Sequence, residues 1–91
     1  MSTSEEHINA EILKIEAEIK VVDAERKVVD AERKDNQIKL EATANDGLRN
    51  YYIEINKGLM ESINTMNLRV NTLTDSRNLW ITKMPLMPSQ G

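Results

Sequence analysis

Val21-Val22-Asp23-Ala24-Glu25-Arg26-Lys27 is followed at once by Val28-Val29-Asp30-Ala31-Glu32-Arg33-Lys34, a perfect tandem duplication of seven residues. Seven residues make nearly two turns of an α-helix, so each residue type returns to almost the same side of the helix. This pattern is typical of a long helix that packs against other helices. It predicts how the chain packs, but it identifies neither a substrate nor a reaction.

Apolar residues continue the same spacing toward the N-terminus. They form one stripe whose steps alternate between four and three residues, as in the seam of a coiled coil. We expect the stripe to be buried against other helices as a protein interface. Isoleucine at both core positions favours trimers or tetramers in parallel coiled coils. The stripe consists of Ile8, Ile12, Ile15, Ile19, Val22, Arg26, Val29 and Arg33.

Arg26 and Arg33 stand where the stripe requires apolar residues, and two interpretations are open. In the first, the arginines lie in the seam, reach glutamates of neighbouring helices and specify register or oligomeric state. In the second, the arginines are exposed and the true interface is another apolar line on the same helix. The small residues of that line permit close helix approach; they are Ala17, Val21, Ala24, Val28 and Ala31.

The helical pattern is interrupted at Asn45-Asp46-Gly47, which is strong turn chemistry. We expect Gly47 to adopt the left-handed conformation that ends the first helix. Apolar spacing restarts in a new phase directly afterwards. Helices are therefore predicted over about residues 4–44 and 48–82, within a helical domain of residues 1–83. Pro85 and Pro88 predict that residues 84–91 form an extended tail.

The sequence predicts an all-α fold, and two architectures fit it. The first is a long coiled-coil helical hairpin, in which Val70 lies opposite Val22 and Met66 opposite Arg26. The second is a single, nearly continuous rod in a parallel bundle, about 120 Å long at 1.5 Å per residue. The change of apolar phase favours the hairpin. Charge also favours antiparallel contact, since residues 1–46 carry 12 acids and 7 bases while the remainder carries 3 acids and 5 bases.

Composition argues against an enzyme. The 91-residue chain has no cysteine, which excludes disulfides and thiolate metal sites. His7 is the only histidine, so with Glu11 it supplies at most half of a metal site. The carboxylates alternate with lysine and arginine, as on a solvated helix face, and no glycine-rich phosphate loop is present. We expect no catalytic residues, no cofactor, no bound metal and no small-molecule substrate.

Other classes of partner are also disfavoured by the sequence. Tyr51 and Tyr52 do not lie among clustered bases, so a nucleic-acid partner is not expected. No apolar run is long enough to span a membrane. The polar, acidic N-terminus does not resemble a signal peptide. The expected location is the cytoplasm or a macromolecular assembly such as a virion.

The end of the chain is its most apolar segment, and tryptophan is a typical anchor of protein interfaces. The leading interpretation is a non-enzymatic structural or assembly subunit that self-associates or binds other subunits, and scaffolds or cements a larger complex. Viral, phage and secretion-apparatus components offer an analogy. The alternative is a helical-hairpin adaptor, chaperone or inhibitor that binds one protein through the Trp80 region. The expected contact residues there are Leu79, Trp80, Ile81, Met84, Leu86 and Met87.

Overall fold

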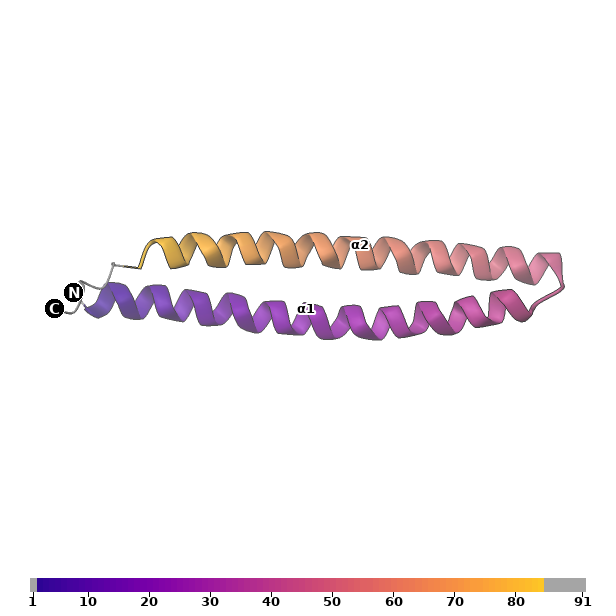
Figure 1. Ribbon diagram of the computed structural model, residues 1–91, viewed down its shortest axis with the longest axis horizontal. Helices are drawn as coiled ribbons and strands as arrows, with labels where there is room; N and C mark the ends of the chain where they lie inside the picture. Colours follow the sequence, from indigo (N-terminus) through magenta and orange to yellow (C-terminus); the bar gives the residue numbers. More distant parts are fainter. Residues whose placement is uncertain (1, 85–91) are drawn as a thin grey trace.

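The chain folds into two long antiparallel helices, as the computed structural model in Figure 1 shows. The structure describes residues 2–84, with side chains from Ser4 onward. Helix α1 spans Ser2–Ala42 and helix α2 spans Asp46–Thr82. The molecule measures 71 × 18 × 17 Å. The predicted all-α helical hairpin is confirmed, and the helix bounds agree with the predicted ones to within about two residues; the chain is not a continuous rod.

The turn uses Asn45 rather than Gly47. Asn45 has extended backbone angles (φ −81°, ψ 121°), and its side chain accepts a hydrogen bond from the Leu48 backbone N–H at 3.0 Å. It is therefore the N-cap of α2. Gly47 lies inside the first turn of α2, and no glycine in the described part of the chain has a positive φ. The prediction of a left-handed Gly47 was wrong because Asn45 begins α2 before Gly47, which therefore lies inside that helix and has no positive φ.

Helix α1 ends with a hydrogen bond between residues three apart, and not with a residue in the left-handed conformation. The Thr43 backbone N–H donates to the Leu40 carbonyl at 3.3 Å, and the Thr43 hydroxyl donates to the Lys39 carbonyl at 2.7 Å. These bonds satisfy carbonyl groups that the end of a helix leaves without partners. The connection between the helices is thus only three residues, 43–45, which forces α2 to return directly along α1.

The core is a single thin line along α1. Among the described side chains, the buried apolar ones are Ile8, Ile15 and Val22, at 8%, 7% and 6% exposure. They recur every seven residues, which is the repeat that the sequence predicts for the seam. Helix α2 contributes no fully buried residue. A pair of helices can cover only one side of each, so most of the surface of both remains in solvent.

Polar contacts between the helices establish their register. The Asn36 side-chain amide donates to the Tyr52 carbonyl at 2.8 Å near the turn. At mid-length, the Arg26 guanidinium donates to Asn67 at 3.0 Å, one residue from the predicted level of Met66. These contacts fit an antiparallel pair with a short connection.

Candidate protein-interaction surfaces

The predicted seam lies between the two helices of the same chain. Its isoleucines and valines are buried or half-buried, and they face α2. The sequence pattern therefore correctly identifies the face of α1 that packs. That these residues also contact another chain stays a prediction. The seam comprises Ile8, Ile12, Ile15, Ile19, Val22, Arg26, Val29 and Arg33.

The two seam arginines are half-buried, each beside an acid on its own helix. Arg26 pairs with Asp23 and also reaches Asn67 across the seam. Arg33 pairs with Asp30, with 3.3 Å between Nη2 and Oδ1. Neither arginine side chain is fully exposed, at 35% for Arg26 and 29% for Arg33, and Arg26 reaches α2 through Asn67. That the arginines specify register or oligomeric state stays a prediction. The nearby acids are aspartates of the repeat, not Glu25 or Glu32.

Asp30 receives two cations at once. The Lys34 ammonium lies 3.2 Å from one carboxylate oxygen, and Arg33 lies 3.3 Å from the other. The hydrogen bond from Lys34, followed by that from Arg33, lowers the pKa of the Asp30 carboxyl below its ordinary value, although partial desolvation opposes the shift. The site is open to solvent, and its ion pairs join residues three and four apart on one helix, so they support local helix structure.

Asn36 is the buried polar side chain of the hairpin, with 7% exposure. It occupies the next seven-residue position after Val22 and Val29, where the pattern calls for an apolar residue. Its hydrogen bond to the Tyr52 carbonyl satisfies the amide. The seven-residue spacing alone could have found it, had the stripe been extended past Arg33.

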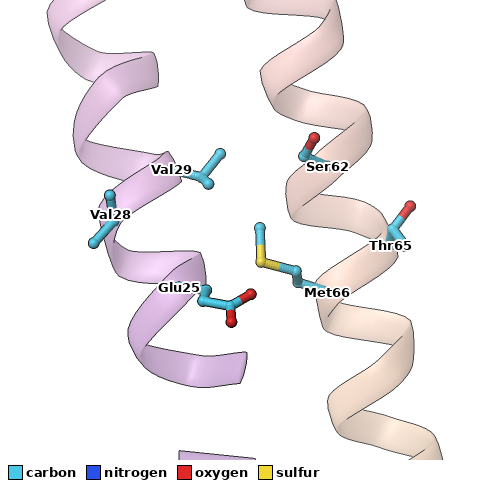
Figure 2. Close-up of a pocket in the computed structure, with 6 residues that line it drawn as sticks. All are labelled: Glu25, Val28, Val29, Ser62, Thr65 and Met66. Atoms are coloured by element: carbon cyan, nitrogen blue, oxygen red, sulfur yellow. The ribbon is translucent and has the colours of Figure 1, made fainter. Parts of the chain in front are cut away.

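Two shallow grooves run along one side of the hairpin, where side chains of α1 and α2 do not close the gap. Figure 2 shows the first, of about 520 Å³, with Val29 and Met66 pointing into it. The second groove continues toward the open end and has a volume of about 420 Å³. The first is lined by Glu25, Val28, Val29, Ser62, Thr65 and Met66; the second by Lys14, Ala17, Glu18, Val21, Val22, Glu25, Met66 and Arg69.

The first groove combines apolar and polar side chains. Valine and methionine line it together with the hydroxyl groups of Ser62 and Thr65 and the carboxylate of Glu25. In the second groove, two of the charged residues pair with each other across the helices: Arg69 lies 3.3 Å from Glu18. In residues 2–84 no three His, Cys, Asp or Glu side chains are grouped closely enough to hold a metal ion.

The apolar C-terminal segment is divided between covered and exposed residues. The Trp80 ring meets the His7 ring edge to face, with 5.6 Å between the ring centroids, and the Lys83 ammonium lies 4.5 Å from the Trp80 centroid. Leu79 and Ile81 are 64% and 47% exposed, and Met84 is half-buried. Leu86 and Met87 lie outside the described residues. The sequence did not reveal the His7–Trp80 pair, because the register that sets Val70 opposite Val22 would set Trp80 opposite Ile12, five residues from His7.

The second apolar line of α1 is the largest exposed apolar feature of that helix. Val21 is 57% exposed and Val28 is 60% exposed, and the three alanines between and beside them are also exposed. Ile38, further along the same side, is 65% exposed. Apolar side chains at this exposure along several turns mark a surface that another molecule can cover.

Comparisons with known proteins do not identify a family. Neither protein-family models, nor curated proteins, nor solved structures give a match to this chain. Neither α1 nor α2 contains a stretch that is long and apolar enough to cross a membrane.

Proposed function

We propose that this protein is a non-enzymatic structural subunit that oligomerises through coiled-coil contacts of its helices and scaffolds or cements a larger complex. The observation that carries the proposal is the imbalance between the hairpin's length and its core. Two helices of 41 and 37 residues bury only three apolar side chains within the described region. Valine, leucine and isoleucine side chains remain in solvent along both helices. Contact with further helices would bury them, which is the main favourable term in helix association.

The small stability that contacts within one hairpin supply supports the same proposal. Most ion pairs along α1 join residues three or four apart on an exposed surface, and each contributes about 0.2–0.5 kcal/mol. Small helical units of this size usually need oligomerisation or exceptional packing for stability. Association with other subunits supplies both the missing burial and a role in assembly.

The experiment that tests the proposal measures mass and helicity together. Light scattering should give a mass that is a multiple of 10.4 kDa, and circular dichroism should show that helicity rises with concentration. A fully helical monomer of unchanging mass over the micromolar to millimolar range would contradict self-assembly.

A second function, in a different class, is that of an adaptor, chaperone or inhibitor that holds one protein through the Trp80 region. The exposure of Leu79 and Ile81 beside Trp80 favours it. Replacing both Leu79 and Ile81 by serine should then abolish partner binding and leave helicity intact. Leu68→Ser is the matched control, because Leu68 is 67% exposed on the same helix but lies away from this segment. A soluble monomer that co-purifies with one partner would favour the adaptor over the scaffold.

A further inference from the structure

Outside the seam that packs against α2, helix α1 carries a second apolar line with regular spacing. We call it the outer face, defined as Ala17, Val21, Ala24, Val28, Ala31 and Ile38. Every residue of this set is exposed. Between Ala17 and Ala31 the steps alternate between four and three residues, so these side chains form a second stripe, distinct from the seam that meets α2. Ala17, Val21 and Val28 of this stripe also line the grooves between the helices. In Figure 2, Val29 points toward α2, and Val28 lies on a different side of the α1 backbone from Val29.

Between Ala17 and Ala31, a row of charges of one sign borders each edge of the outer face; beside Ile38, the position on the acidic edge is Lys39. On one edge, glutamates recur every seven residues as Glu11, Glu18, Glu25 and Glu32. On the other edge, lysines recur with the same spacing as Lys20, Lys27 and Lys34. Glu25 and Glu32 are exposed and make no ion pair with any described residue, and neither does Lys20. The helix therefore presents an acidic edge, an apolar centre and a basic edge.

This arrangement is complementary to itself in one orientation only. When two identical helices pack in parallel through the same face, each edge row of one meets the opposite edge row of the other. Lysines would then meet glutamates. When the helices pack antiparallel, each row meets its own copy, so glutamate would face glutamate and lysine would face lysine. Like charges at such positions destabilise a helix pair and determine which orientation forms.

We propose that the outer face of α1 binds a second copy of this chain, with the two α1 helices parallel and in register. This inference rests on the proposed function, since it names a partner and a surface for the same assembly. Lys20 and Lys27 of one copy pair with Glu25 and Glu32 of the other, and each apolar residue of the outer face packs against its counterpart. The order of helices across the dimer is α2, α1, α1, α2.

The charged residues at the two ends of the apolar line are compatible with the parallel arrangement. Lys14 and Asp35 occupy the outer-face positions before Ala17 and after Ala31, and in register each would approach its own counterpart. Both are already neutralised within the chain: Lys14 lies 3.3 Å from Glu11, and Asp35 lies 3.2 Å from Lys39. Ile38 lies beyond Asp35 and meets Ile38 of the second copy only when the helices are parallel.

Disulfide cross-linking of full-length variants tests the surface and the orientation together. The chain has no cysteine, so in a variant with one introduced cysteine, a disulfide can form only between that position in two copies. Ala17→Cys and Ala31→Cys lie at the two ends of the apolar line, and both native residues are exposed. Parallel packing brings each cysteine within the 4.4–6.8 Å between Cα atoms that a disulfide requires. Antiparallel packing separates each from its counterpart by roughly 20 Å or more, at 1.5 Å per residue.

We expect each variant to cross-link with itself faster than Asn64→Cys, an exposed control position on α2. A covalent dimer that forms only when Ala17→Cys and Ala31→Cys are mixed would show antiparallel packing and overturn the proposal. Rates equal to that of Asn64→Cys would show that the outer face is not the contact. Circular dichroism of each reduced variant confirms that it is folded.

Charge reversal gives an independent readout. Lys20→Glu with Lys27→Glu makes both edges acidic, and Glu25→Lys with Glu32→Lys makes both edges basic. Each double variant alone should dissociate at concentrations at least about tenfold higher than wild type does, and an equimolar mixture should recover the wild-type mass. Unchanged masses for both variants would overturn the proposal.

The two proposals can fail separately. A wild-type oligomer by light scattering without cross-linking at positions 17 and 31 would retain the scaffold function and overturn the outer-face contact. A monomer at all concentrations, again without cross-linking, would overturn the outer-face contact and self-assembly together.

Discussion

Single residues at the turn and in α2 show where the hairpin can be strengthened. A Cβ atom added at Gly58 would meet no other atom within 4 Å, whereas one added at Gly47 would lie 3.2 Å from the capping oxygen of Asn45. Alanine has a higher helix propensity than glycine by about 1 kcal/mol. Gly58→Ala should therefore raise the free energy of unfolding by about 0.5–1 kcal/mol, measured by urea denaturation. Gly47→Ala should give a smaller gain, because its new methyl group crowds the cap; equal gains would contradict this explanation.

The cap itself is also open to test. Asn45→Ala removes the acceptor for the Leu48 N–H and should lower the free energy of unfolding by about 1 kcal/mol. Asn45→Asp keeps the acceptor and should retain most of the stability. Asn50→Ala, at an exposed position one turn further along, is the control and should leave the melting temperature nearly unchanged. An Asn45→Ala protein as stable as wild type would show that the turn does not depend on its cap.

Asp30 gives the hairpin a small dependence on pH. Its pKa is lower in the folded chain than in the unfolded one, mainly because Lys34 donates a hydrogen bond to it. The contribution to stability is therefore present above the unfolded pKa and is lost as the pH falls through the folded pKa. Asp30→Asn should reduce the loss of stability on acidification below about pH 4, seen by thermal melts at pH 3 and pH 7. A variant with the same pH dependence as wild type would contradict the assignment.

At the scale of the helix, the sequence predicted which face of α1 packs against α2 and where the chain turns. The seven-residue repeat correctly indicated the face of α1 that packs, and the interruption at Asn45-Asp46-Gly47 placed the turn. The role of Asn45 was missed because asparagine can begin a helix and glycine can end one, and the sequence of the turn permits either. The His7–Trp80 contact was missed because large side chains meet across several residues of the predicted register, although Arg77 and Glu16 nearby are 3.8 Å apart and within one residue of it.

Packing of the seam is tested by matched charge substitutions on α1. Ile15→Asp places a carboxylate in the most buried line of the hairpin and should cost several kcal/mol, with loss of helicity by circular dichroism. Leu13→Asp makes a similar change two residues earlier, where the side chain is 66% exposed, and should leave helicity intact. Equal effects of the two substitutions would mean that the α1–α2 contact contributes little to folding.

At the scale of the whole molecule, the hairpin shape can be measured in solution. Spin labels at positions 12 and 80 lie on neighbouring stretches of α1 and α2, whose axes should be about 8–10 Å apart. In a continuous rod the same labels would be separated by about 100 Å, at 1.5 Å per residue. Pulsed electron resonance on spin-diluted protein should therefore give a short distance within one chain. A long distance would exclude the hairpin.

The short connection at residues 43–45 also determines how the molecule comes apart under load. Contacts between the helices join residues progressively further apart in sequence, from Asn36 and Tyr52 near the connection to His7 and Trp80 at the open end. Force applied at the open end therefore loads one pair of side chains at a time, as in a zipper, and never loads the whole seam in shear. Closure from the connection proceeds in the opposite order, because each new contact needs only a short further loop. Amide exchange should accordingly be slowest next to the connection and fastest at the open end.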